Sequence, residues 1–130
     1  MFFRRKKNAP LTDPQLRYNK LMDLYGSGKL EEKDFSAFCL TDYLSGVCSE
    51  GHWGWFSSTS ELRGASALAV IVGTLGEILP RHLNDNLKRA YDAFGTDAGA
   101  EVCEAADRYF LGYEEEVYDA LQQYADGLFR

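Results

Sequence analysis

A thiol and an imidazole stand close together near the middle of the chain, at Cys48 and His52. A helix end followed by a turn would bring them into contact, which is the pairing that a cysteine nucleophile requires. The flanking residues supply no recognisable oxyanion element or orienting acid. Cys39, Cys48, His52 and His82 also suggest a metal site, but their spacing matches no zinc pattern. We therefore predict no catalytic residue, no metal site, no cofactor and no enzymatic activity.

Aromatic side chains are concentrated around His52. Residues 50–59 hold both tryptophans and a phenylalanine, and their glycines predict a loop between two helices. Such a loop either packs inward as part of the core or lines a recognition surface. The second reading leaves open a small-ligand or hydrolase pocket around His52 and Trp55, flanked by Trp53 and Phe56.

Acidic residues dominate the C-terminal part of the chain, where nine acids and one base, Arg108, lie between Asp97 and Asp126. At about 100° per residue, helices would place them on two faces. The predicted partner-binding acids are Asp97, Glu101 and Glu104 on one face, and Glu115, Asp119 and Asp126 on the other. Carboxylates at i and i+4 lie about 6 Å apart along a helix, close to the separation of successive phosphates. The pattern predicts a face for a basic partner, with an ordinary solvated face as the alternative.

The overall charge excludes some partners. The chain carries a net charge of -6, although residues 4–7 are all basic. The acidic body should repel nucleic acid, so we predict no direct nucleic-acid binding. Residues 1–10 are predicted to be a flexible basic tip that gives no stable membrane association. Three cysteines without a C-x-x-C pair suit reduced thiols in the cytoplasm.

The elements that must position these residues are helical. Apolar spacing and end signals predict helices over about 13–25, 31–47, 60–79, 83–94, 97–111 and 113–128, with Ser60 capping the third. We expect an all-α fold, with residues 11–130 forming a single-domain irregular or orthogonal bundle of about six helices. Residues 67–72 are apolar on every side, which indicates a central helix or, as the competing assignment, a short buried strand. If the fold does not bury them fully, we expect a symmetric homodimer.

The order of these elements resembles the helical domain of the bacterial DNA-mimic protein family, whose signature loop reads roughly N-G-G-F-x-Q-Y/F before a small polar stretch. Gly51 matches the first glycine, Trp53 and Phe56 the two aromatic positions, and Ser57 the polar stretch. The sequence departs from the signature at Glu50, His52 and Trp55. The resemblance implies a non-enzymatic acidic interaction protein that binds a basic, DNA-binding protein. The alternatives are an immunity-type antagonist of a basic toxin and the small-ligand or hydrolase pocket.

Overall fold

The structure, a computed structural model, describes residues 14–125 of the chain. This part of the chain forms six helices and no strand, which confirms the predicted all-α bundle. The helices are α1 (Pro14–Gly26), α2 (Glu32–Arg63), α3 (Ala65–Ile78), α4 (Arg81–Ala93), α5 (Gly99–Leu111) and α6 (Glu114–Ala125). The predicted basic tip, residues 1–10, lies outside the described residues.

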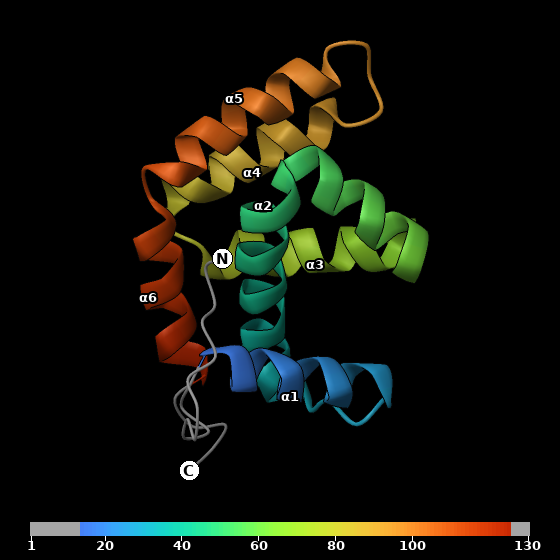
Figure 1. Cartoon of the computed structure of the whole chain (residues 1–130), viewed down its shortest axis with the longest axis vertical. Coiled ribbons are helices and arrows are strands. Elements are labelled where there is room, and N and C mark those ends of the chain that lie inside the picture. The colour runs from blue at the N-terminus through green and yellow to red at the C-terminus, as the bar shows by residue number, and fades with distance from the viewer. Residues whose placement is uncertain (1–13, 126–130) are drawn as a thin grey trace.

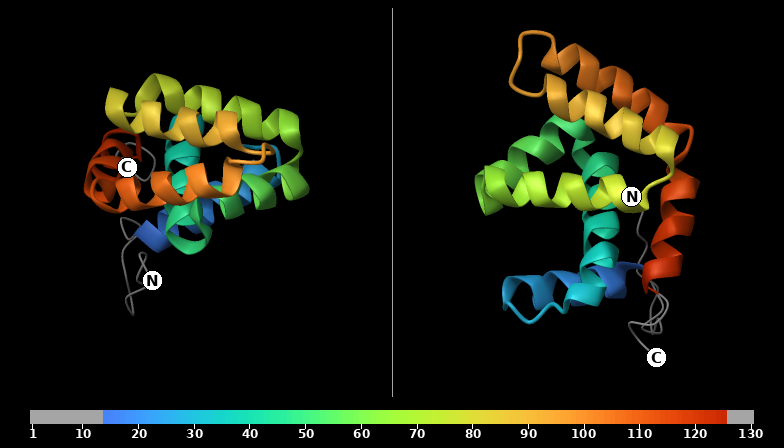
Figure 2. Two further views of the ribbon diagram at one scale, coloured as in Figure 1. Left: turned by 90° about the horizontal axis from the view of Figure 1, so that it is seen from above. Right: turned by 180° about the vertical axis from the view of Figure 1, so that it is seen from behind.

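Helix α2 is the centre of the bundle and contacts each of the other five helices. In Figure 1, its first half stands upright, with α1 across its lower end and α3 across its middle. Helices α4 and α5 lie side by side over its upper end, and α6 runs along its flank. The views from above and from behind in Figure 2 show that these helices cross at varied angles rather than running parallel. The bundle is therefore irregular, as predicted.

The predicted loop over residues 50–59 is wrong, because the chain leaves the helical conformation at one residue only. Gly51 has φ 74° and ψ 175°, and α2 continues beyond it to Arg63. That conformation is open essentially to glycine alone, so Gly51 bends α2 into two halves without ending it. The signal for a helix was present in the spacing i, i+3, i+4 and i+7 of the residues that the second half buries, namely His52, Trp55, Phe56 and Thr59. The neighbouring glycines and serines concealed it.

The bend lets aromatic residues from both halves of α2 meet in one core. Tyr43, in the first half, is fully buried. Its ring meets the edges of Trp55 from the second half and Phe110 from α5, with centroid separations of 5.2 and 5.4 Å. Phe56 is also fully buried and contacts Tyr91 and Phe94 at the end of α4. Edge-on ring contacts of this kind add to the stabilisation that burial provides.

Helix α3 confirms the helical assignment of residues 67–72 over the strand. It begins after Gly64, which has φ 96°, so the prediction that Ser60 caps this helix is wrong. The apolar segment is only half buried: Leu68 and Ile71 face the core, whereas Val70 is 58% exposed. The homodimer stays a prediction. Within residues 14–125, no helix has both the length and the apolar content that a membrane span requires.

Candidate functional site

The predicted acidic faces lie on the last two helices. Four of the six predicted acids are exposed there: Glu101 and Glu104 on α5, and Glu115 and Asp119 on α6. Asp97 is exposed as well, but α5 begins at Gly99, so Asp97 lies in the preceding turn and does not extend the α5 face as predicted. Asp126 lies outside the described residues.

Charge is unevenly divided between this part of the molecule and the rest. Residues 97–125 hold eight acids and one base, whereas residues 14–96 hold ten acids and eight bases. The one base, Arg108, donates to Glu104 over 3.1 Å, and both side chains are largely exposed. A solvated pair of this kind contributes little and exchanges readily with other partners. Helices α5 and α6 are therefore strongly acidic although the net charge of the chain is modest.

Exposed apolar residues accompany these acids where α5 passes into α6. We call Tyr109, Leu111 and Tyr113 the aromatic corner; all three are exposed, and the two tyrosine rings lie 4.9 Å apart. His82 of α4 joins them: its Nδ1 lies 2.8 Å from the Tyr109 hydroxyl and its Nε2 lies 2.7 Å from Glu116. In the sequence, His82 stands out only as a possible metal ligand. Sequence reasoning therefore missed this cluster, because its members meet across three helices.

The bend of α2 is stabilised by a hydrogen-bonded network around the buried His52 side chain. The backbone N–H of His52 donates to Asp107 Oδ1 over 2.7 Å, so a carboxylate from α5 caps the helical segment that starts after the bend. The same oxygen lies 2.7 Å from His52 Nδ1, and His52 Nε2 lies 2.8 Å from the Tyr43 hydroxyl. Burial and, secondarily, the charge of Asp107 raise the pKa of Tyr43 well above its ordinary value, so its hydroxyl stays protonated and donates.

This network occupies both nitrogens of His52, which is fully buried. A carboxylate accepts hydrogen bonds, so the N–H group of His52 is at Nδ1 and donates to Asp107. Nε2 then accepts the hydrogen bond from the Tyr43 hydroxyl. The imidazole therefore faces the core and does not line an open pocket. The ring supports the bend.

The hydrogen bond of Cys48 is made to α6 and not to this imidazole. Cys48 Sγ donates to Glu114 Oε2 of α6 over 3.6 Å. Burial, followed by the charge of Glu114 and this hydrogen bond, raises the pKa of the Cys48 thiol from 9.0 to about 12. The thiol is therefore protonated at neutral pH, whereas a cysteine nucleophile reacts as the thiolate.

Alkylation of Cys48 should consequently be slow. At pH 8 a three-unit rise in the pKa of Cys48 lowers its thiolate fraction about 1000-fold, and the greater nucleophilicity of a more basic thiolate offsets part of this. We expect iodoacetamide to modify Cys48 about 50-fold more slowly than free cysteine, and faster in Glu114→Gln, as measured by peptide mass spectrometry. Modification of Cys48 at the rate of free cysteine would contradict this assignment.

The other residues of the predicted loop lie in different environments. Gly51 forms the bend, Phe56 enters the core, and Ser57 is partly exposed. Trp53 is 39% exposed and packs its ring edge-on against Phe94, with the ring centroids 4.9 Å apart. The structure therefore does not gather the four residues that carry the family resemblance into one surface.

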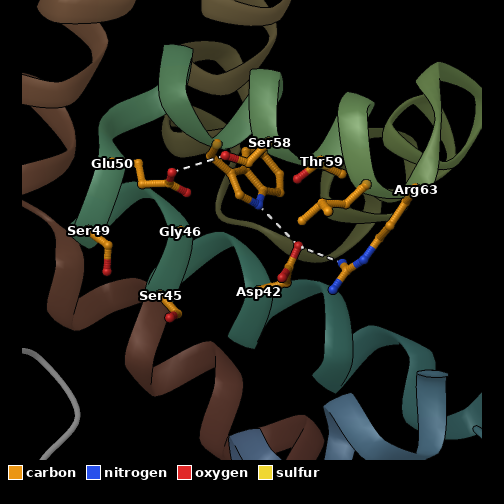
Figure 3. Close-up of a pocket in the computed structure, with 10 residues that line it drawn as sticks. Asp42, Ser45, Gly46, Ser49, Glu50, Ser58, Thr59 and Arg63 are labelled. Carbon is orange, nitrogen blue, oxygen red and sulfur yellow. Dashed lines mark hydrogen bonds and ion pairs between the residues drawn. The ribbon is translucent and has the colours of Figure 1, made fainter.

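A polar pocket lies between the two halves of α2 (Figure 3). Trp55 is one of the residues that line it. We call it the elbow pocket; its volume is about 230 Å³. Its polar lining residues are Asp42, Ser45, Ser49, Glu50, Trp55, Ser58, Thr59 and Arg63. The Trp55 indole Nε1–H donates to Asp42 Oδ2 over 3.0 Å. Of the two residues predicted for an alternative pocket, Trp55 therefore lines the elbow pocket, and His52 is not among the residues that line it.

The four side chains considered as metal ligands are dispersed. Cys39 is buried in the core, Cys48 contacts Glu114, His52 belongs to the network at the bend, and His82 belongs to the cluster at the aromatic corner. No group of three or more potential ligands among the described residues is placed to hold a metal ion.

Comparisons with protein-family models, with curated proteins and with solved structures found no match for this chain. The likeness to the DNA-mimic family therefore stays a prediction that rests on the residues quoted for it.

Proposed function

We propose that this protein acts by binding a basic protein through the acidic side formed by α5 and α6, with a DNA-binding protein as the partner. The observation that carries the proposal is the concentration of eight acids and one base within residues 97–125. Glu101, Glu115 and Asp119 are exposed and form no ion pair with another described residue. These charges are therefore available to a partner.

The aromatic corner supports an interface at this place rather than a merely solvated face. Tyrosine is enriched where interfaces concentrate their binding energy, because its ring buries much area and loses little conformational freedom. Tyr109 and Tyr113 stand beside Glu115 and Glu116 at the start of α6. An arginine of a basic partner can stack on a tyrosine ring while its guanidinium pairs with a neighbouring carboxylate.

The spacing of acids on α6 also suits a partner whose basic surface normally contacts a nucleic-acid backbone. Glu115 and Asp119 are four residues apart on α6, which separates their positions by about 6 Å along the helix axis. Such a row presents regularly spaced negative charges to basic side chains. Binding of this kind weakens with salt, because screening shortens the reach of exposed charges.

The test is capture of partners from a host lysate at low salt by the purified protein, followed by measurement of affinity for each captured protein. Neutralising two acids in Glu115→Gln/Asp119→Asn should weaken binding about tenfold, which corresponds to about 0.7 kcal/mol per charge. The matched control Glu61→Gln/Glu77→Gln removes the same charge from exposed positions on α2 and α3 and should leave binding nearly unchanged.

Competition with duplex DNA separates the kinds of partner. Displacement of the captured protein by the duplex supports a DNA-binding partner whose nucleic-acid site the acidic side occupies. Capture of a basic toxin that the duplex leaves bound would replace this conclusion with an immunity-type antagonist. Equal binding by the two double variants would refute an α5–α6 interface with either partner.

A further inference from the structure

The elbow pocket has a polar lining whose hydrogen-bonding capacity is only partly used. The hydroxyl groups of Ser45, Ser49 and Thr59 form no hydrogen bond with another described residue, whereas Ser58 donates to Glu50 Oε1 over 3.0 Å. Figure 3 shows Glu50 and Ser58 at one end of the pocket and Asp42 with Arg63 at the other. Thr59 is 5% exposed, so its hydroxyl depends on the pocket for a partner. A polar ligand would supply partners for these groups.

The charge of the lining is unbalanced. Asp42 Oδ2 accepts from Arg63 Nη1 over 3.2 Å, which pairs one of the two pocket acids with the one pocket base. Arg63 is held in that position, because its Nη2 contacts Met22 Sδ and its guanidinium lies over the rings of Tyr25 and Phe38. Arg63 is therefore already engaged and is poorly placed to bind an anion.

Glu50 is the acid that remains without a cation. It forms no ion pair with another residue of 14–125. Burial raises the pKa of Asp42, and the charge of Glu50 adds to that rise, so the two carboxylates repel each other across the pocket. A cation beside Glu50 would relieve this repulsion.

The volume limits the size of the ligand. The volume of the elbow pocket is about 230 Å³. It is larger than a cavity of roughly 150 Å³ that accommodates benzene. It is smaller than the pockets of about 300 Å³ or more that bind drug-sized molecules. The pocket therefore suits a molecule of about ten non-hydrogen atoms.

We propose that the elbow pocket binds a small hydroxylated organic cation, in which a protonated amine pairs with Glu50 and neighbouring hydroxyl groups bond to Ser45, Ser49 and Thr59. The site is separate from the acidic side of α5 and α6, so binding here does not depend on the function proposed above. A single ion pair and a few hydrogen bonds in a half-open pocket predict an affinity in the millimolar range.

Glucosamine and glucose are suitable probes, because they have the same number of non-hydrogen atoms and only glucosamine carries an ammonium group. The Trp55 indole N–H is the reporter, since it lies in the pocket wall and donates to Asp42. Its resonance would be followed by NMR at fixed pH, with sodium chloride matching the ionic strength of glucosamine hydrochloride. We expect saturable shifts with glucosamine and at least about tenfold weaker binding of glucose.

Variants locate the ammonium group. Glu50→Gln keeps an oxygen that can accept from Ser58 and removes the charge, so it should abolish the preference for glucosamine. Glu61→Gln, an exposed position on the same half of α2, should leave the preference intact. Ser49→Ala should weaken both sugars, and the dispersion of the amide spectrum reports whether each variant is folded.

Several results would overturn the proposal. An unmoved Trp55 indole resonance up to about 50 mM glucosamine, well above the expected dissociation constant, would show that the pocket does not bind this class of ligand. An equal response to glucose and glucosamine would remove the pairing of an amine with Glu50, as would an equal loss of the preference for glucosamine in Glu50→Gln and Glu61→Gln. A response to ammonium chloride as strong as that to glucosamine would likewise refute recognition of the hydroxyl groups.

Discussion

Gly51→Ala is expected to lower the free energy of unfolding by about 3 to 5 kcal/mol, a large fraction of the stability of an ordinary domain. Two effects combine. The φ of 74° and ψ of 175° at Gly51 are strained for alanine by about 1 to 3 kcal/mol. The added methyl carbon would also stand 2.5 Å from Asp107 Oδ2, so the carboxylate that caps the second half of α2 must move. Urea denaturation followed by circular dichroism measures the change.

Gly73→Ala is the matched control, because it makes the same substitution at an exposed position inside α3. A methyl group there meets no atom within 4 Å, and Gly73 does not have a positive φ. Alanine in a helix is favoured over glycine, so this variant should gain up to about 1 kcal/mol. Equal stability of the two variants would contradict the role assigned to the bend.

Asp107→Ala is expected to cost about 2 to 4 kcal/mol. It removes the acceptor of both the His52 backbone N–H and His52 Nδ1 and leaves two donors at a fully buried residue without a partner. The first of these two bonds is the helix cap, which alone is worth about 1 kcal/mol. The same denaturation experiment gives the cost, and hydrogen exchange of the His52 amide should accelerate.

Glu104→Ala provides the comparison on the same helix. Glu104 is one turn from Asp107 and largely exposed, and its bond to Arg108 is solvated, so stability should change little. The double variant Gly51→Ala/Asp107→Ala should be less destabilised than the sum of the single variants, because the methyl group then has no carboxylate to displace. Strict additivity would show that the backbone strain at Gly51 acts alone.

The helices could be predicted because their signals are local. The apolar spacing and end signals that define α1, α4, α5 and α6 lie within a few residues of one another. Where the prediction failed, around Gly51, a local signal for a turn competed with a local signal for a helix. The buried spacing from His52 to Thr59 favoured a helix, and the glycines favoured a loop. Tertiary packing decides between the two, because the aromatic side chains of the second half of α2 become buried when this half packs against the first.

Some features of the candidate sites could likewise be predicted from the sequence, and others could not. The acidity of residues 97–125 is a property of composition, and exposure follows from the polar faces of their helices, so the sequence alone determined both. The sequence also determined the helical class of the fold. The tertiary structure decided which distant residues meet: Asp107 with His52, Arg63 with Asp42, and His82 with Glu116. Such contacts depend on the path of the whole chain, and here that path turns on one backbone conformation that glycine permits at Gly51.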